Sequence, residues 1–492
     1  SYFILFLGPF VVRPFLSTSI NAEILGIEDL FLKAVAMLSI VEMGISFGIS
    51  YKLYKPLAEN DTKRIAILLN LYKKAFKIVA RIIFILGAIT ALMIPIFVKE
   101  STFSNLWLSS VFFIYVLDTL AAYLYGHKRA MLIADQKNYL VNLSRCSCQF
   151  IMFMVQLIVI YYFKSFVMYA VSRLLFTVLE NVIINIQYKK RYSNINHREI
   201  SEQLPEEEKR DLFKNLTALM YHKVGAQSLS SASSFIIMPI LGSIVTGKYG
   251  SYSMITNGIL RVTDQVFSSI LASFGNYMVQ NTKKRVFELF KKIYFLNYLI
   301  LSFFSISVFC VINPFIDLWM GGSFLLPKST VFLLTLYFYI FGMRQSVGMV
   351  KNSAGIYRPD RFLSLIEAGI NITLAIFLVG KIGLNGVLIA NLISMFVIPF
   401  WSQPYLIYKN VFNRKVWGYY GRYFYYLAIT LISGALTYFA CSYFNQTGFL
   451  KLVINLGVCL VIPNVINLVL FSRTEDFRYL VRVLKNTLKI KK

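Results

Sequence analysis

The chain has 492 residues, of which 57% are hydrophobic, 16% aromatic and only 15% charged. Because ordinary globular domains carry about 25% charged residues, this composition excludes a conventional cytosolic enzyme, a disordered chain and a secreted disulfide scaffold. The 50 lysines and arginines outnumber the 23 aspartates and glutamates and leave a formal net charge of +27. Such an excess is typical of a nucleic-acid-binding protein or of a membrane protein with its basic residues on one side.

The apolar residues are grouped in long blocks. A run of about 18 or more largely uncharged residues predicts a membrane-spanning helix, because the hydrocarbon layer is about 30 Å thick. Fourteen such blocks follow one another, at residues 1–21, 28–51, 76–98, 105–126, 139–163, 165–187, 216–246, 251–280, 293–313, 328–350, 361–380, 384–407, 424–444 and 449–471. We therefore predict an all-α integral membrane protein with about fourteen transmembrane helices.

The basic residues predict how these helices are oriented. Even-numbered connections and the tail hold runs such as Lys63-Arg64, Lys283-Lys284-Arg285 and Lys491-Lys492, whereas odd-numbered connections are short and poor in lysine and arginine. Basic connections stay in the cytoplasm, so we expect both termini to be cytoplasmic. Since the basic residues alternate with apolar helices and do not cluster on one soluble face, we exclude nucleic acid as a partner.

The two ends of the chain differ in polarity: the first 20 residues are mainly apolar, whereas the tail alternates apolar and basic residues. Residues 1–20 lack the basic first region and the cleavage site of a signal peptide, so we predict a functional first helix, preceded by a short segment because Ser1 is not methionine. In the tail, apolar residues recur at helical intervals beside basic ones between Thr474 and Lys489. This pattern predicts an amphipathic helix on the anionic inner leaflet.

All five cysteines fall within predicted helices: Cys146, Cys148, Cys310, Cys441 and Cys459. Buried free thiols that pack as small apolar groups are the expected outcome, ahead of disulfides or a metal site. Cys146 and Cys148 have no accompanying histidine or second cysteine pair, so we predict no metal site.

Two connections resemble each other. Asp61-Thr62-Lys63-Arg64 precedes Lys73-Lys74, and residues 281–285 (NTKKR) precede Lys291-Lys292, six predicted helices later. Because six is an even number of helices, the two similar connections would start two copies with the same orientation in the membrane, as in transporters built from parallel repeats. The alternative explanation of the similarity is a general excess of basic residues at cytoplasmic junctions. The predicted organisation is an N-terminal lobe at 1–187, a linker at 188–215, a C-terminal lobe at 216–407, two further helices at 408–471 and a basic tail at 472–492.

Ionisable residues inside predicted helices are candidate functional groups, because each costs about 2.5–3.5 kcal/mol to insert. The candidates are Arg13, Glu42, Asp118, Lys223, Arg261, Asp264 and Glu367. Arg261 and Asp264, three residues apart, form either part of a site or a pair that neutralises itself. Lys223 is close to the inner end of its helix, where snorkelling to the headgroups is the alternative. Arg13 lies about half-way along its helix.

No motif of a soluble enzyme is present. Residues 242–247 (GSIVTG) lack the lysine of a phosphate-binding loop, so we expect no ATP hydrolysis within this chain. The predicted external connections are short, whereas a membrane polymerase or glycosyltransferase normally needs a large external loop. We therefore predict a transporter and not an enzyme.

Several stretches resemble the Wzx-type polysaccharide flippases of the multidrug/oligosaccharidyl-lipid/polysaccharide exporter superfamily, which also includes MurJ and the MATE transporters. They follow the order expected for that family and cover most of the chain: Leu25–Leu30, Glu42–Gly44, Leu53–Asp61, Leu318–Gly321, Ala354–Arg361, Glu367, Asn371 and Gly383–Val387. The resemblance implies two six-helix lobes in a V around a central cavity, with two extra C-terminal helices. By position, Arg13, Glu42, Lys223, Arg261 and Asp264 fall in helices that line this cavity in such proteins.

The resemblance also implies a function. The chain would move an undecaprenyl-diphosphate-linked oligosaccharide from the inner to the outer leaflet of the bacterial cytoplasmic membrane by alternating access, for capsule, O-antigen or exopolysaccharide synthesis. Arg13, Arg261 and Lys223 would contact the headgroup. Glu42, Asp264, Asp118 and Glu367 would bind a coupling cation (H⁺ or Na⁺) or form charge pairs. We expect no cofactor beyond that cation, and membrane lipids, a polysaccharide polymerase and chain-length machinery as partners.

Three alternative functions suit the sequence less well. A cation-coupled multidrug exporter of the same fold would need an acidic, aromatic cavity, whereas Arg13, Lys223 and Arg261 are cationic. A membrane polysaccharide polymerase is disfavoured by the short external connections. A passive scaffold would not explain ionisable residues within the membrane.

Overall fold

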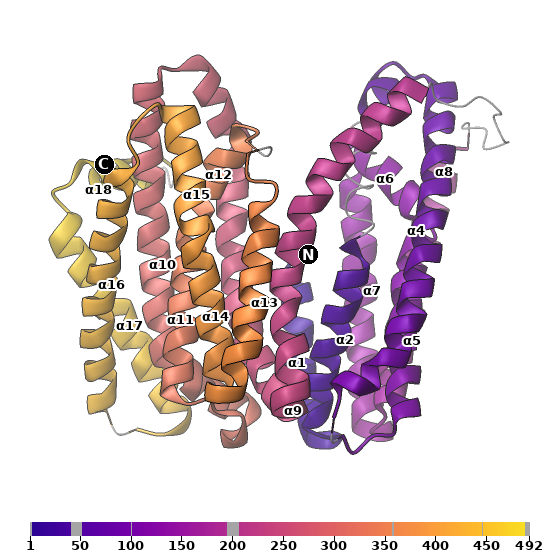
Figure 1. Cartoon of the computed structure of the whole chain (residues 1–492), viewed down its shortest axis with the longest axis horizontal. Helices are drawn as coiled ribbons and strands as arrows, with labels where there is room; N and C mark the ends of the chain where they lie inside the picture. Colours follow the sequence, from indigo (N-terminus) through magenta and orange to yellow (C-terminus); the bar gives the residue numbers. More distant parts are fainter. Residues whose placement is uncertain are drawn as a thin grey trace. The chain divides into compact units, whose positions relative to one another are not determined.

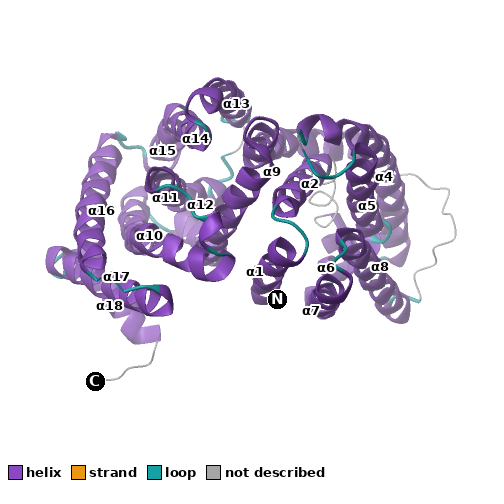
Figure 2. Cartoon of the chain, turned by 90° about the horizontal axis from the view of Figure 1, so that it is seen from below, coloured by secondary structure: helices purple, strands orange, loops and turns teal. Residues whose placement is uncertain are grey.

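The computed structural model describes residues 2–40, 52–99, 101–193, 206–356, 359–444 and 446–487, and for 2–6, 206–223, 226 and 487 it describes only the backbone. Helices dominate these ranges, which contain no strand (Figure 2). The predicted all-α class is thus confirmed. The chain divides into two compact units, unit 1 (Ser1–Gly250) and unit 2 (Ser251–Lys492). The predicted lobe and linker boundaries stay a prediction.

Unit 1 holds seven labelled α-helices and the first part of an eighth, within the ranges described. They are α1 (Tyr2–Ser19), α2 (Glu23–Leu38), α4 (Thr62–Phe97), α5 (Asn105–Tyr123), α6 (Gly126–Ala134), α7 (Asn138–Ile158), a π-helical turn (Val159–Phe163), α8 (Phe166–Arg191) and α9 (Glu206–Gln280) up to Gly250. Helices α4, α5 and α8 pack side by side (Figures 1 and 2). Side-chain caps define their starts: the Asp61 carboxylate accepts from the Arg64 N–H, and Ser104 and Ser165 cap α5 and α8.

Unit 2 contains the rest of α9 and the helices that follow it. They are α10 (Lys283–Met320), a 3-10 turn (Gly322–Phe324), α11 (Lys328–Met343), α12 (Gln345–Ser353), α13 (Leu363–Ile382), α14 (Leu384–Val397), α15 (Pro399–Ile407), a π-helical turn (Tyr408–Phe412), α16 (Trp417–Tyr443), α17 (Gly448–Phe471) and α18 (Glu475–Thr487). Helices α10, α16 and α17 lie against one another (Figure 1).

Eleven helical segments of the described chain are long and apolar enough to cross a membrane, so this is a multi-pass membrane protein. The count of fourteen crossings stays a prediction. One of the eleven, Gln227–Gln280, has 54 residues and a length of about 80 Å, enough for more than one hydrocarbon layer. It belongs to α9, which contains two predicted spans in one helix, with a kink where Gly242 adopts φ 85°. Only glycine takes this backbone conformation without strain.

Several helix ends differ from the predicted ones for physical reasons. Helix α4 begins at Thr62 instead of 76, and α10 begins at Lys283 instead of 293, because lysine and arginine are good helix formers that hydropathy assigns to connections. The two similar connections thus lead into two similarly long helices, of 36 and 38 residues, and the repeat stays a prediction. Helix α6 lies in a predicted connection. The predicted span 328–350 is broken between α11 and α12, and 384–407 is broken at Pro399, the first residue of α15.

Contacts between connections of unit 1 agree with the predicted alternation of sides. In unit 1, the odd-numbered connections one and three meet where Asn21 donates to Thr102 at 3.3 Å. The even-numbered ones meet at Asp135, whose carboxylate accepts from Lys137 at 2.6 Å and from the Tyr192 hydroxyl at 2.5 Å. Burial alone would raise the pKa of Asp135, but these hydrogen bonds outweigh it and lower that pKa below its usual range. Which side is cytoplasmic stays a prediction.

The predicted amphipathic tail helix is present as α18. Its Phe477 and Leu480 pack against the core of unit 2, and Lys292 lies 3.7 Å from the Glu475 carboxylate. Val483 and Leu484 are exposed. Part of its apolar face is therefore covered by protein, and the contact with lipid stays a prediction.

Candidate functional site

The interior of unit 1 contains an ion pair between α1 and α2. Two guanidinium nitrogens of Arg13 donate to the two carboxylate oxygens of Asp29, at 2.9 and 2.8 Å. The Arg13 side chain is only 7% exposed. Its Nη2 also donates to the carbonyl oxygen of Gly247 on α9, at 3.1 Å. This two-pronged geometry is the strongest form of an arginine–carboxylate pair, so Arg13 joins three helices in this conformation.

Glycines make this approach of helices possible. A side-chain carbon on Gly26 would lie 1.9 Å from the backbone oxygen of Ser243, and one on Gly250 would lie 1.7 Å from the Asp29 carboxylate. A carbon on Gly247 would touch the backbone nitrogen of Gly26 at 3.0 Å. Helices α2 and α9 therefore pack backbone to backbone, as small residues allow within membranes. The stretch 242–247 has a structural role in this packing.

Glu28, beside Asp29 on α2, is buried and accepts a hydrogen bond from the Tyr169 hydroxyl of α8 at 2.7 Å. One helical turn further along α8, the Arg173 guanidinium donates to Asp118 of α5 at 2.8 Å. The Thr177 hydroxyl donates to the other oxygen of Asp118 at 2.5 Å. The charged groups of α1, α2, α5 and α8 thus form one region, which we call the unit 1 charge network.

An aromatic side chain lies between the two parts of this network. The Arg173 guanidinium lies over the Tyr115 ring, with its carbon 5.4 Å from the ring centroid, a favourable cation–π distance. The Tyr115 hydroxyl is buried and has no hydrogen-bond partner among the described residues. A buried hydroxyl without a partner is costly, so this position can accept a hydrogen bond from a ligand or water or donate one.

The charge balance of the network gives it a chemical capacity. It contains the carboxylates of Glu28, Asp29 and Asp118 but only the guanidinium groups of Arg13 and Arg173. Two carboxylates are paired with arginines, whereas the described contacts of Glu28 are to a hydroxyl. An unbalanced carboxylate in a low-dielectric interior takes up a proton or a cation at a lower energetic cost than staying charged.

Unit 2 places its buried charges at a helix break. Arg344 stands between α11 and α12, and its Nη1 lies 3.9 Å from a carboxylate oxygen of Glu367 on α13. The amide nitrogen of Asn297 donates to the carbonyl oxygens of Gly342 and Met343, at 3.2 and 3.0 Å. These bonds satisfy backbone groups freed by the break, as a membrane interior requires.

A second buried ion pair joins Lys351 of α12 to Asp360, and both side chains are 4% exposed. Asp360 belongs to one of the stretches that resemble the flippase family, and the pair ties it to α12. Breaking a buried pair of this kind is costly, because one charge would be left without its partner.

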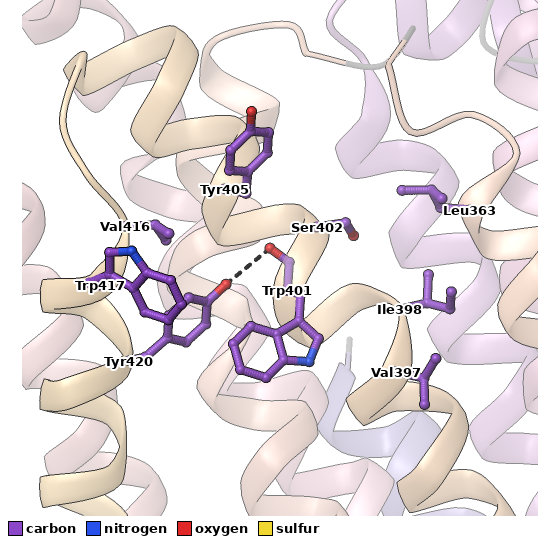
Figure 3. A pocket seen from close by; sticks show the side chains of 9 residues that line it. All are labelled: Leu363, Val397, Ile398, Trp401, Ser402, Tyr405, Val416, Trp417 and Tyr420. Carbon is purple, nitrogen blue, oxygen red and sulfur yellow. Dashed lines mark hydrogen bonds between the residues drawn. The ribbon is translucent and has the colours of Figure 1, made fainter.

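The surface of unit 2 has an aromatic groove of about 370 Å³. Figure 3 shows Trp401 and Tyr405 of α15 on one side and Trp417 and Tyr420 of α16 on the other. The Tyr420 hydroxyl donates to the Trp401 carbonyl oxygen at 3.1 Å, the dashed line in the figure. Tryptophan and tyrosine are enriched where a membrane meets water, so this groove is typical of an interfacial belt.

Solved structures show which known proteins share this fold. One described as "Lipid II flippase MurJ, inward closed conformation" matches with a TM-score of 0.70 and 12% identity, over 96% of this chain and 97% of the other. An inward-facing MATE-family multidrug resistance transporter of the MOP superfamily matches with a TM-score of 0.59 and 13% identity, over 79% of this chain and 92% of the other. A mutant form of the Vibrio cholerae MATE transporter VcmN matches with a TM-score of 0.55 and 11% identity, over 84% of this chain and 96% of the other. No protein-family model and no curated protein sequence matches. The chain has the fold of MurJ and the MATE transporters.

The predicted site residues fall into different environments. Arg13 and Asp118 belong to the unit 1 charge network, and Glu367 pairs with Arg344 in unit 2. Arg261 and Asp264 are exposed in unit 2. No ion pair joins those two among the described contacts. Glu42 lies outside the described residues, as does the side chain of Lys223. The roles proposed for all seven stay predictions.

Sequence reasoning missed Glu28 and Asp29 as site residues. The second span was predicted to start at residue 28, whereas α2 begins at Glu23, so the two carboxylates appeared to lie at the very edge of the membrane instead of within the helix. A usable signal was present: Ile27 precedes the pair and Leu30 follows it, so the two carboxylates interrupt an apolar stretch. Tyr115, Tyr169 and Thr177 carried no signal, because uncharged polar residues are common in membrane helices.

Proposed function

We propose that this protein is a flippase that moves an undecaprenyl-diphosphate-linked oligosaccharide from the inner to the outer leaflet of the bacterial cytoplasmic membrane. The observation that carries the proposal is the full-length likeness to a solved lipid II flippase, which covers 96% of this chain and 97% of the other. The match to the inward-facing MATE transporter covers 79% of this chain and so leaves about a fifth of it without a counterpart. A lipid-linked saccharide is therefore the substrate class that best suits this architecture.

The chemistry of the substrate agrees with the charges of the chain. A diphosphate with attached sugars cannot cross hydrocarbon unaided, so it needs a hydrated cationic path while its lipid tail stays in the bilayer. Arginine suits a phosphate because its planar fork donates two parallel hydrogen bonds. Arg261 is exposed and has no ion-pair partner among the described contacts, so we assign it the headgroup contact. An inside-negative potential would favour outward movement of the anion by about 2.3 kcal/mol per charge per 100 mV.

In the proposed transport cycle, Arg13 would also contact the phosphate headgroup, in a step that follows its release from Asp29. Its fork is occupied by Asp29 in this conformation, so a phosphate would have to compete with that carboxylate. Lys223 and Glu42 complete the predicted cavity set, and Glu28 adds a carboxylate that can take up a coupling proton. A transport cycle in which protonation changes this network would couple movement of the headgroup to the proton gradient.

The test is complementation of a flippase-null strain, with surface polysaccharide and the leaflet location of the lipid-linked intermediate as readouts. Arg261→Ala is expected to abolish export and Arg261→Lys to retain part of it, at equal expression. Normal export from the Arg13→Ala/Arg261→Ala double variant would contradict the headgroup assignment. Glu28→Gln, which keeps the hydrogen bond from Tyr169, is expected to transport without pH dependence; an unchanged pH profile would exclude Glu28 as the coupling group.

A cation-coupled multidrug exporter is the second candidate, because two MATE transporters share the fold with TM-scores of 0.59 and 0.55. This function would make a deletion strain sensitive to organic cations and leave its polysaccharide intact. The proposed flippase gives the opposite pair of results. Partner proteins such as a polymerase and chain-length machinery belong to the same proposal and would be tested by co-purification.

A further inference from the structure

Three cysteines of unit 2 converge in space. Cys310 lies on α10, Cys441 on α16 and Cys459 on α17, and each residue is buried. Their three sulfur atoms all lie within 4.8 Å of one another. They are far apart in the chain, so the meeting results from helix packing. The sequence predicted buried free thiols, and all five cysteines are buried and free; the meeting of three of them was not predicted.

The three sulfurs are free thiols that lie close enough to share one ligand. Three thiolates bound to one metal ion at about 2.3 Å would lie about 4 Å from each other. A disulfide instead requires two sulfurs at about 2 Å. The group contains neither histidine nor carboxylate within the described part of the chain, so its donor set is three sulfurs alone.

We propose that Cys310, Cys441 and Cys459 form a three-sulfur site for a soft monovalent metal ion, Cu(I). Soft thiolates select such ions, and Cu(I) accepts three ligands, whereas structural zinc is almost always bound by four. The side chains around the sulfurs are largely apolar, including Ile306, Phe309 and Val458. Each thiol that binds as thiolate gives up its proton to solvent, and no electron is transferred.

Two neighbouring contacts support such a site. The Asn455 amide, one turn before Cys459 on α17, donates to the backbone oxygen of Cys310 at 3.1 Å and so holds two ligand-bearing helices together. Tyr438 packs against the cluster and accepts a hydrogen bond from Lys328 Nζ at 2.7 Å. This positive charge, one side chain away, would offset the negative charge of a thiolate complex. A bound ion would fasten α16 and α17 to α10.

The experiment uses the purified full chain in lipid nanodiscs and titrates Cu(I) against a chromophoric chelator. We expect one tightly bound ion per chain, a sulfur-only shell by X-ray absorption, and a higher unfolding temperature in its presence. Cys459→Ala and Cys441→Ala are expected to lose the ion. The matched control Cys146→Ser/Cys148→Ser, which removes the two buried cysteines of α7, is expected to keep it.

A readout on the unaltered protein covers variants that fail to fold. Bound Cu(I) should protect three of the five cysteines from alkylation, identified by peptide mass spectrometry, and a chelator should expose them. Unchanged copper stoichiometry in folded Cys459→Ala, the absence of protection, or a disulfide between two of the three in protein alkylated at lysis would each overturn the proposal. These results do not depend on whether the chain is a flippase.

Discussion

The two units stabilise their interiors by different chemistry. Unit 1 places arginines and carboxylates against each other on α1, α2, α5 and α8. The core of unit 2 is dominated by aromatic rings, including Tyr294, Tyr298, Tyr339 and Tyr423, and its helices are joined mainly by neutral hydrogen bonds such as that from Tyr298 to Asn467 at 2.6 Å. Neutral bonds within membranes are worth about 0.6 kcal/mol each, whereas a broken buried ion pair costs about 3–5 kcal/mol. Unit 2 also has ion pairs, Arg344–Glu367 and Lys351–Asp360, but these lie at the α11–α12 break and in the segment after α12. The packing of α1, α2, α5 and α8 against one another therefore depends on charge pairs to a degree that the aromatic core of unit 2 does not.

The largest expected effect follows from leaving Arg13 without its partner. Asp29→Asn should lower the free energy of unfolding by about 3–5 kcal/mol, measured by chemical denaturation in detergent, because a buried guanidinium would lose its counter-charge. The exposed residue Asp317 offers a matched control, since Asp317→Asn should change stability by less than about 0.5 kcal/mol.

A double variant separates the structural role of this pair from a role in transport. Arg13→Met/Asp29→Leu removes both charges and should recover most of the lost stability. If export also recovers in complementation, the pair serves only the fold. Export that stays absent in a stable double variant would support its place in the transport cycle.

The next effect concerns the close packing of α2 and α9. Gly26→Ala should destabilise the protein by about 3 kcal/mol, because the added carbon would meet the backbone oxygen of Ser243 at 1.9 Å. Gly369→Ala is the control, since nothing lies within 4 Å of the added carbon there. Equal thermal unfolding of the two variants would contradict the backbone-to-backbone contact.

A neutral network in unit 2 should matter less. The Asn371 amide nitrogen of α13 donates to Asn391 and Ser394 of α14, at 2.7 and 3.2 Å. Asn371→Ala should cost about 1 kcal/mol and leave the pH profile of transport unchanged. A loss as large as that of Asp29→Asn would show that the contrast between the units is wrong.

The smallest expected effect is that of Tyr298→Phe, which removes the hydrogen bond from the Tyr298 hydroxyl to Asn467. The predicted cost is about 0.6 kcal/mol. A double-mutant cycle with Asn467→Ala isolates this bond from the packing of the ring. A coupling energy near zero would mean that the two side chains are stabilised independently.

The sequence was sufficient for the class of protein and for most helices. Apolar blocks of about 20 residues predict membrane helices because the backbone must satisfy its own hydrogen bonds in hydrocarbon. The same reasoning failed for charged helix ends such as Lys283, where hydropathy falls although the helix continues. It also failed at Arg344, because a helix break inside a membrane depends on the partner that satisfies the freed carbonyl groups, here Asn297.

The sequence alone determined the all-helical membrane class, the alternation of basic and non-basic connections and the presence of costly ionisable residues, since each depends on local composition. Only the tertiary structure decided which groups meet: Arg13 with Asp29, Asp118 with Arg173, and three distant cysteines with one another. The physical reason is that insertion into a membrane is governed by each segment separately, whereas pairing energies arise from helices far apart in the chain that are brought together by packing.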